Sequence, residues 1–284
     1  MTDYPDVLYS VKDHIATVTM NRPDRLNAYN DKLASGIRMA IADAAKDTNV
    51  RVIVLTGAGR GFCAGADMQV LQAVDTTGGT QRQASRGQGD VGDAFNSKYG
   101  PNLDEDFKDM TRFGYFMRTK KPIIAAINGP AAGIGFIMSL YADMRFISDK
   151  AVITTSFAQR GLIAEHGISW LLPRLVGAGN ALDLLLSARK ISPQEAKDMN
   201  LVNKIFPNEN FMENVMAYAH ILADTVSPRS MAVMKAQVWK SFFQTFGEAL
   251  EVADAEMPPS FVWPDFKEGV SHFLEKRSPK FADI

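Results

Sequence analysis

The sequence predicts an α/β fold, in which a largely parallel sheet is followed by a helical C-terminal region. Short β-branched apolar runs alternate with segments of helical periodicity, as in parallel strands joined by crossover helices. Two of these runs lead directly into glycine-rich turns. Helical patterns follow one another in the last third, so a boundary near Pro207 is expected to divide the chain into 1–206 and 207–284.

The N-terminal half supplies four predicted strands. Val7 to Val11 and His14 to Met20 flank a polar pair, which predicts a hairpin. Val52 to Thr56 and Ile123 to Ile127 are rich in β-branched and apolar residues, which is typical of strands buried on both faces. These two buried strands are the ones that precede the glycine-rich turns.

Two apolar stripes at helical spacing accompany these strands. One stripe consists of Leu33, Ile37, Ala40, Ile41 and Ala44. The second ends shortly before Pro122 and consists of Leu103, Phe107, Met110, Phe113 and Met117. Short strands are also predicted at Met144 to Ser148 and Val152 to Thr154.

The last third changes character and becomes helical. Ser192-Pro193-Gln194-Glu195 has the sequence of a capping box, with proline at the first helical position. A short strand is predicted at Val202 to Phe206. Two later stripes predict helices that pack on the chain's own core or on a neighbouring subunit: Met212, Val215, Met216 and Ala219, then Phe266, Val270, Phe273 and Leu274.

Composition argues against several classes of protein. The 284 residues carry a net charge of −1 and no strong basic cluster, which speaks against nucleic-acid binding. No run reaches the roughly 18 apolar residues of a membrane span. The single cysteine, Cys63, excludes an internal disulfide and a multi-cysteine metal site. The N-terminus has neither a secretory signal nor an Arg-rich transit peptide, so a cytoplasmic protein without a metal is expected.

The two glycine-rich turns run from Gly57 to Asp67 and from Asn128 to Gly135. Each lies between a predicted buried strand and a possible helix, which leaves free backbone N–H groups pointing at one spot. Two such turns can direct two N–H groups at one developing oxyanion. That geometry suits an enzyme that forms enolates from thioesters.

A nucleotide-binding site fits the first turn poorly. The third glycine of G-x-G-x-x-G would fall at Phe62, and the region that should hold a second strand with an acidic end is irregular. A P-loop is excluded because no Gly-Lys-Ser/Thr sequence follows. From Thr76 to Pro101 the chain is rich in Gly, Gln, Ser and Asp, and we expect a mobile lid over the binding pocket there.

The ordered motifs of the chain resemble those of the crotonase (enoyl-CoA hydratase/isomerase) superfamily. They span nearly the whole chain and comprise Asn21 to Ala28, Ala64 to Asp67, Asn128 to Gly135, Gly161 to Glu165, Pro173 to Gly177, Ile191 to Ala196 and Glu275 to Phe281. The resemblance implies a spiral of ββα units with a helical C-terminal region. It also implies assembly as trimers, or as hexamers made of two trimers.

The resemblance further implies an acyl-CoA substrate whose enolate is held by the backbone N–H groups of Ala66 and Ile134. Gly65 and Gly133 let the backbone approach the thioester closely. No cofactor is expected, because coenzyme A is part of the substrate. Substrate contacts are expected from Arg25, Leu26, Ala28, Ala64, Gly65, Ala66, Asp67, Met68, Gly133 and His166, and across a subunit boundary from Lys280 and Phe281.

The sequence departs from the standard hydratase at that enzyme's two glutamates. Aligned on the flanking glycines, these positions are Ile137 and Phe157, and neither side chain can move a proton. Glu165 remains as the candidate acid/base, in a Gly-Leu-Ile-x-Glu turn that resembles the Δ3,Δ2-enoyl-CoA isomerases. Its apolar neighbours are expected to raise its pKa by desolvation, which suits proton removal from C2 and its return at C4.

Several alternatives stay open. With His166 as a second group, Glu165 could support hydration of a 2-enoyl-CoA. A thioester hydrolase, and an acyl-CoA-binding protein that has lost its chemistry, are further alternatives. Structural or pocket-lining roles, rather than a nucleophile or cofactor site, are expected for Cys63, Asp143, Trp170, Met68, Met110, Met117 and Met138.

Overall fold

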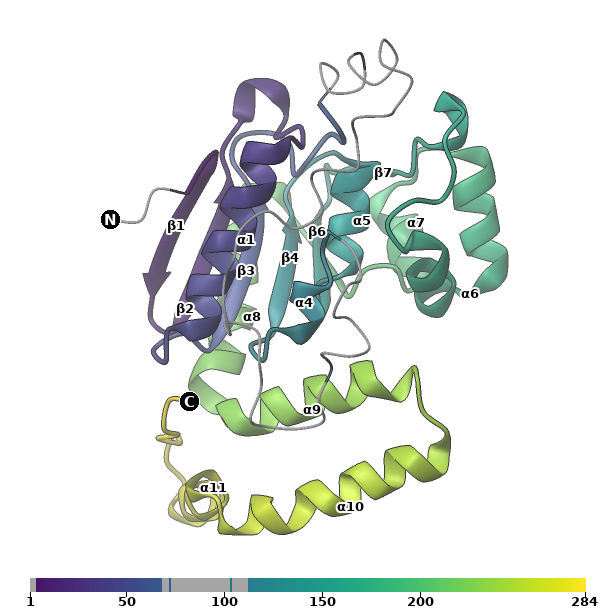
Figure 1. Cartoon of the computed structure of the whole chain (residues 1–284). Coiled ribbons are helices and arrows are strands. Elements are labelled where there is room, and N and C mark those ends of the chain that lie inside the picture. The colour runs from purple at the N-terminus through teal and green to yellow at the C-terminus, as the bar shows by residue number, and fades with distance from the viewer. Residues whose placement is uncertain (1–3, 68–71, 73–102, 104–111) are drawn as a thin grey trace.

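The computed structural model describes residues 4–67, 72, 103 and 112–284, and Figure 1 shows their arrangement. The described residues form the predicted α/β fold. The expected lid at Thr76 to Pro101 lies outside them, as do Met68, Phe107 and Met110. The helix predicted from the stripe that ends at Met117 is therefore described only in its last turn, α4 (Tyr115–Arg118).

A six-stranded sheet forms the centre of the described structure (Figure 1). The first two strands pair antiparallel, with Val7 opposite Met20, and each later strand is parallel to its neighbour. This confirms the predicted hairpin and the predicted parallel pairing. The strand order is β1 (Val7–Lys12), β2 (Ile15–Met20), β3 (Val52–Gly57), β4 (Ile123–Ile127), β6 (Met144–Ser148) and β8 (Lys204–Phe206).

Helix α1 (Asp31–Lys46) covers one face of the sheet (Figure 1). It begins at Asn30, whose side-chain oxygen accepts a hydrogen bond from the backbone N–H of Leu33 at 2.8 Å. The predicted apolar stripe is buried, and residues such as Ile37 share a core with Leu55 of β3. Burial of this stripe, rather than helix propensity alone, fixes the helix on the sheet.

Helix α8 (Phe211–Thr225) covers the opposite face. Because side chains alternate along a strand, Val52 and Val54 point to this face and pack with Val215 and other residues of α8. The expected boundary near Pro207 thus comes shortly before α8 in the sequence, and α8 shares its core with the sheet. The helices that follow α8 form a separate layer below it (Figure 1).

Short elements connect the sheet to the region of the second glycine-rich turn. Two of them pair in parallel as a small sheet, β5 (Ala131–Ala132) and β7 (Ile153–Thr154). Near them lie α5 (Ile134–Leu140) and η4 (Ala158–Arg160). Two further short helices lie elsewhere, η1 (Pro23–Arg25) between β2 and α1 and η5 (Asn208–Asn210) between β8 and α8. Helix α5 follows β5 directly, so the turn at Gly133 joins the small sheet to that helix.

Two caps differ from the predicted arrangement. Ser192 caps α7 (Pro193–Asp198) by accepting a hydrogen bond from the backbone N–H of Glu195 at 3.2 Å. The carboxylate of Glu195 pairs with Arg189 at 2.5 Å instead of returning to Ser192, so the predicted reciprocal box is half formed. A complete capping box occurs where none was predicted, between Thr245 and Glu248 at the start of α10 (Phe246–Val262).

The lower layer consists of α9 (Pro228–Ser241), α10 and α11 (Pro264–Glu275) (Figure 1). A buried polar contact ties this layer to the sheet. Asp143 accepts hydrogen bonds from Trp239 at 3.0 Å and from the backbone N–H of Ile123 at 2.7 Å, and it pairs with Lys235 at 2.7 Å. The structural role expected for Asp143 is confirmed, since it caps the chain where β4 begins.

The apolar residues of the lower layer are only partly covered by the chain's own core. Phe273 and Leu274 of α11 are 78% and 73% exposed, and Phe246 and Val262 of α10 are both 84% exposed. The predicted stripe on α11 therefore faces away from the core of its own chain. Within the described ranges, none of the helices combines the length and the apolar character that crossing a membrane requires.

Candidate active site

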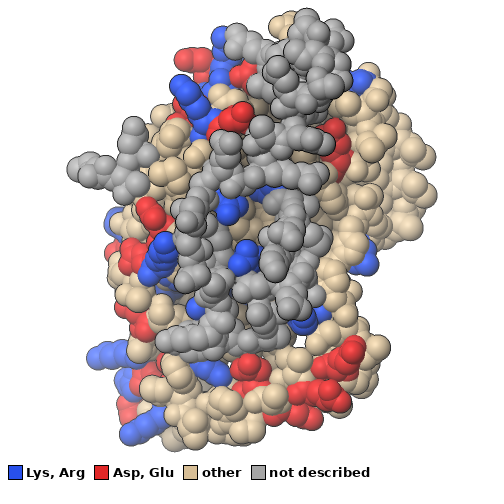
Figure 2. All heavy atoms as spheres, viewed as in Figure 1, with Lys and Arg blue, Asp and Glu red and all other residues tan. Residues whose placement is uncertain are grey.

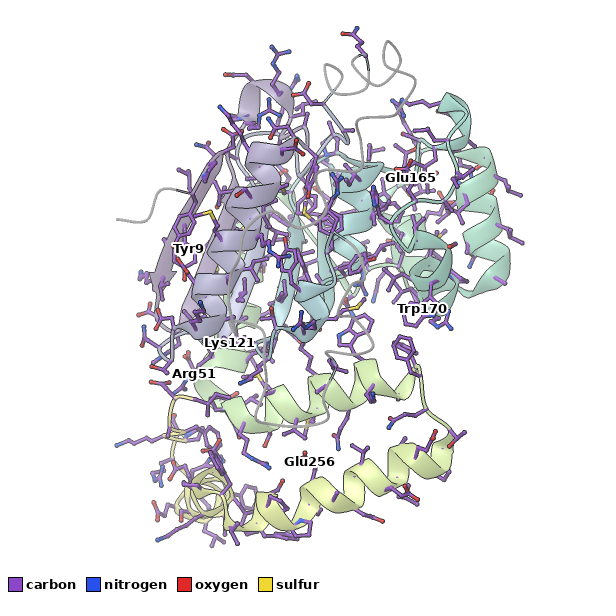
Figure 3. The ribbon with its side chains drawn as sticks, in the orientation of Figure 1. Tyr9, Arg51, Lys121, Glu165, Trp170 and Glu256 are labelled. Carbon is purple, nitrogen blue, oxygen red and sulfur yellow. The ribbon has the colours of Figure 1, made fainter. Side chains whose placement is uncertain are left out.

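The two glycine-rich turns and the Glu165 turn border one cavity of about 320 Å³. Ten residues predicted for the site are brought together here: Arg25, Ala28, Ala64, Gly65, Ala66, Asp67, Gly133, Ile134, Glu165 and His166. The other described lining residues are Ala132, Thr155, Ser156, Phe157, Arg160 and Leu162. Figure 3 shows Glu165 beside α6 (Ile168–Ser187), far from the lower helical layer.

The last residues of the first turn pair with the backbone of Tyr29. Tyr29 donates its backbone N–H to the carbonyl of Gly65 at 2.8 Å, and Asp67 donates its N–H to the carbonyl of Tyr29 at 2.9 Å. Because peptide groups alternate in direction along an extended chain, the N–H of Ala66 points away from Tyr29. Gly65 has a φ of +105°, a conformation that disfavours any residue with a side chain.

The second turn presents another N–H beside the first. Gly133 has a φ of +50° and donates its N–H to the carbonyl of Thr154 at 3.1 Å. Ile134 then begins α5, so its N–H has no acceptor within the helix. The two turns lie in contact, because a Cβ placed on Gly65 would lie 3.2 Å from the carbonyl oxygen of Ala132.

A further glycine allows α5 to approach the first turn. A Cβ placed on Gly135 would lie 2.3 Å from the carbonyl oxygen of Cys63 and 2.7 Å from its Sγ. Cys63 itself is fully buried, and burial raises the pKa of its thiol to about 12. A neutral buried thiol is a poor nucleophile, which agrees with the structural role expected for Cys63.

A buried ion pair that no local sequence pattern predicted stabilises the first turn. Arg22 pairs with Asp67 at 2.9 Å and with Asp6 at 3.4 Å, and its Nη1 also donates to the carbonyl of Ala28. Asp67 was expected to contact coenzyme A, and it does line the cavity. Its side chain is nevertheless only 9% exposed and accepts a hydrogen bond from Arg22, so its described role is to hold the turn.

Two asparagine side chains brace the loop that leads into the first turn. Asn27 is fully buried and donates from Nδ2 to the carbonyls of Gly61 at 2.8 Å and Ala58 at 3.0 Å. Asn128 donates from Nδ2 to the carbonyls of Gly57 at 2.9 Å and Gly59 at 3.0 Å. Both asparagines lie in motifs that resemble those of the crotonase superfamily. The sequence did not predict which distant backbone carbonyls their side chains would bind.

Glu165 and His166 form a partly exposed acid–imidazole pair. Oε2 of Glu165 lies 3.3 Å from Nε2 of His166, and the two side chains are 26% and 23% exposed. Among the described residues that line the cavity, Asp67 and Glu165 alone carry carboxyl groups. Asp67 is paired with Arg22, whereas Glu165 lies beside an imidazole, so the two carboxylates stand in different surroundings.

Some predicted substrate residues lie away from the cavity. Leu26 packs beside Gly61 and does not line the cavity. Lys280 donates its backbone N–H to Glu268 at 2.6 Å, and the carbonyl of Phe281 accepts from Arg51 at 2.7 Å, so one chain does not bring the C-terminus to the site. Contact with substrate from these two residues stays a prediction that requires a second subunit.

The remaining predicted residues are mainly structural. Trp170 stacks on Phe243 with ring centroids 5.3 Å apart and lies under the guanidinium of Arg174 at 4.0 Å (Figure 3 labels Trp170). Met117 and Met138 are buried in the core. Ile137 is fully buried in α5, whereas Phe157 lines the cavity. No group of three potential metal ligands occurs in the part of the chain that the structure describes.

Charge is spread over the surface without a single dominant sign. Figure 2 shows both signs of charge on the visible described face, with acidic side chains gathered at the lower right over α10. At the cavity itself, Arg25 and Arg160 add positive charge to the lining. Both arginines are exposed, so they can meet an anionic group that enters from solvent.

Comparison with known proteins places the chain in one family. The family model described as enoyl-CoA hydratase/isomerase matches residues 10–284. A 1,2-epoxyphenylacetyl-CoA isomerase of Escherichia coli is 30% identical over 97% of this chain and 98% of its own length. A probable enoyl-CoA hydratase of Mycobacterium tuberculosis is 32% identical over 96% of this chain and 90% of its own length.

Solved structures agree with this placement. A putative enoyl-CoA hydratase of Streptomyces coelicolor has a TM-score of 0.83 at 26% identity, covering 99% of this chain and 95% of its own. An enoyl-CoA hydratase subunit of Geobacillus kaustophilus has a TM-score of 0.81 at 28% identity, covering 99% of both chains. The family match, the relatives and the shared fold all cover nearly the whole chain. The protein therefore belongs to the enoyl-CoA hydratase/isomerase family of the crotonase superfamily.

Proposed function

We propose that this enzyme isomerises enoyl-CoA thioesters, moving a double bond from Δ3 to Δ2 with Glu165 as the acid/base. One observation carries the proposal. The carboxylate of Glu165 borders the same cavity as the two glycine-rich turns and lies beside His166, whereas the other carboxylate of the described lining, Asp67, is paired with Arg22. One carboxylate is sufficient for isomerisation, because the base that removes a proton can return it at another carbon.

The proposed reaction uses no water and no cofactor. Glu165 takes a proton from C2 of a 3-enoyl thioester, and the electron pair of that C–H bond moves toward the thioester oxygen. The N–H groups of Ala66 and Ile134 donate to the resulting oxyanion. The protonated carboxyl of Glu165 then returns its proton to C4, which leaves a 2-enoyl thioester and restores the carboxylate.

The cavity lining also supports a site for the coenzyme A portion. We infer that Arg25 and Ala28 border the entrance beside the Ala64–Asp67 turn, with Gly65 allowing the thioester close to the backbone. The exposed guanidinium of Arg25 fits a phosphate group by charge. A thioester substrate also agrees with the names of the two relatives, a 1,2-epoxyphenylacetyl-CoA isomerase and a probable enoyl-CoA hydratase.

We further propose that the chain assembles as a homotrimer or as two such trimers. The exposed apolar side chains of α10 and α11 support this, since surfaces of that kind are uncommon on monomers. A neighbouring subunit covering them could also bring Lys280 and Phe281 to the cavity of another chain. The mass of the purified protein in solution tests this proposal directly.

Hydration of a 2-enoyl-CoA is the second candidate, and the contact between Glu165 and His166 favours it. At 3.3 Å from the carboxylate, the imidazole could share in activating or holding a water. Hydration needs a second group of this kind, whereas isomerisation does not. The relative from Escherichia coli is named as an isomerase and the one from Mycobacterium tuberculosis as a probable hydratase, so the names support both candidates.

The two candidates are separated by supplying 3-enoyl-CoA and crotonyl-CoA in D₂O. We expect conversion of the 3-enoyl ester, with deuterium entering at C2 and C4 because the partly exposed carboxyl of Glu165 exchanges its proton with solvent during repeated turnover. Both conversion and labelling should be lost in Glu165→Gln. Glu213→Gln, which changes an exposed glutamate on α8, serves as the matched control and keeps full activity. Faster water addition to crotonyl-CoA favours the hydratase, and free CoA thiol favours a hydrolase. Tight binding of both esters without exchange at C2 favours a binding protein.

A further inference from the structure

Tyr141 connects the helix of the second oxyanion turn to the candidate acid/base. It directly follows α5, which begins at Ile134, and it is 3% exposed. Its hydroxyl donates a hydrogen bond to the backbone carbonyl of His166 at 2.7 Å. Because His166 follows Glu165 in the chain, this contact fixes the backbone immediately beside the proposed acid/base.

The backbone at this point adopts an unfavourable conformation that neighbouring groups must hold. His166 has a φ of +51° and Gly167 a φ of +76°, so two consecutive left-handed residues precede α6. The turn closes when Ile168 donates its N–H to the carbonyl of Glu165 at 3.1 Å. A left-handed conformation is disfavoured for a residue with a side chain, so the bond from Tyr141 acts where support is needed.

The fit between Tyr141 and this turn is close. A Cβ placed on Gly167 would lie 2.8 Å from the hydroxyl oxygen of Tyr141. Position 167 therefore favours glycine for two reasons, its positive φ and the nearby hydroxyl. The hydroxyl of Tyr141 is therefore in direct contact with the turn.

Aromatic contacts extend the connection to the first oxyanion turn. The ring of Tyr141 lies 5.6 Å from that of Phe113, which lies 5.7 Å from that of Tyr29. The backbone of Tyr29 bonds on both sides of Ala66. Buried rings in contact resist displacement, so the acid/base turn and both oxyanion turns share one rigid support.

We propose that Tyr141 is a positioning residue that keeps the carboxylate of Glu165 in register with the two oxyanion N–H groups. This inference rests on the proposed role of Glu165. Tyr141 does not line the cavity, so it acts through the backbone of His166 and not on the substrate. A displacement of about 1 Å at a reacting group can lower a rate by roughly a hundredfold. Loss of the hydroxyl should therefore slow proton transfer while leaving CoA binding intact.

Tyr141→Phe tests this inference because it removes the hydroxyl and keeps the ring and its packing. The matched control is Tyr115→Phe, since Tyr115 is also buried but lies in α4, away from the acid/base turn. We expect kcat and the rate of C2 deuterium exchange to fall roughly tenfold to a hundredfold in Tyr141→Phe. KM, and the affinity for a saturated acyl-CoA, should stay within about twofold, and Tyr115→Phe should leave kcat within the same limit.

A double variant separates positioning from general stability. Tyr141→Phe should have no further effect on residual C2 exchange when Glu165→Gln is already present, because its effect passes through that carboxylate. Equal losses in both backgrounds, or a lowered thermal midpoint with kcat unchanged, would overturn the role of Tyr141 alone. Full exchange in Glu165→Gln by itself would overturn the proposed function and this inference with it.

Discussion

Gly135→Ala tests the close contact that brings the two oxyanion turns together. The added Cβ would lie 2.3 Å from the carbonyl oxygen of Cys63 and 2.7 Å from its Sγ. Ordinary contacts of a Cβ lie beyond about 3.4 Å, so α5 and the first turn must separate by about 1 Å. Both neighbouring atoms are buried, and the carbonyl belongs to the backbone, so a side-chain rotation cannot relieve the clash.

Two opposing effects set the expected loss of stability. Overpacking of a buried site costs about 1–3 kcal/mol. Replacing a helical glycine by alanine returns about 0.5–1 kcal/mol through the unfolded chain. The free energy of unfolding should therefore fall by about 1 kcal/mol, and by no more than about 2.5 kcal/mol. The effect on catalysis should be larger, because separation of the N–H groups of Ala66 and Ile134 removes about 3–4 kcal/mol of oxyanion stabilisation if one donor is lost.

Urea denaturation and C2 deuterium exchange measure the two effects on the same samples. Gly179→Ala is the matched control, because Gly179 lies in α6 and a Cβ there would meet nothing within 4 Å. This control should be slightly more stable than the parent and equally active. Gly135→Ala with parental stability and an unchanged exchange rate would refute the idea that contact at Cys63 sets the distance between the turns.

Two further predictions concern the first turn. Arg22→Met removes the charge that faces the buried carboxylate of Asp67. Since the side chain of Arg22 is 17% exposed, we expect a loss of about 2–3 kcal/mol in unfolding free energy. If the buried charge of Asp67 causes this loss, adding Asp67→Asn to Arg22→Met should restore stability. A loss below about 0.5 kcal/mol in Arg22→Met alone would argue against this cause. Cys63 should resist iodoacetamide in the native protein at pH 8 and react once unfolded. The pKa of its thiol is about 12 in the folded protein and about 9 in the unfolded chain, so the unfolded chain loses this proton first. The free energy of unfolding should therefore fall as the pH rises above 9, and it should fall less steeply in Cys63→Ala. If the free energy of unfolding falls equally with pH in both proteins, the raised pKa of Cys63 is contradicted.

Local sequence patterns were sufficient for the sheet and for the positions of the two glycine-rich turns. Runs such as Val52 to Thr56 became strands because they are buried on both faces, between α1 and α8. Glycine at 65 and 133 marked positions of positive φ, which a sequence can indicate because few other residues adopt them. The cavity then formed where strand ends and turns meet.

Contacts between distant residues could not be predicted in the same way. Arg22 and Asp67 are 45 positions apart, and Tyr141 is 25 positions from His166, so no local pattern links either pair. The sequence left open whether the stripe of α8 packs on the chain's own core or on a neighbouring subunit, for a related reason. A helical stripe shows which face is apolar but not which surface will cover it.

The central claim is that two backbone N–H groups polarise the thioester carbonyl of a bound substrate. Its most direct test is the carbonyl ¹³C chemical shift of a labelled acyl-CoA bound to Glu165→Gln, a variant that binds the ester without turning it over. Donation from Ala66 and Ile134 predicts a downfield shift relative to the free ester in water, and a smaller shift when Gly135→Ala is added. A bound ester with the same shift as the free one would contradict the claim.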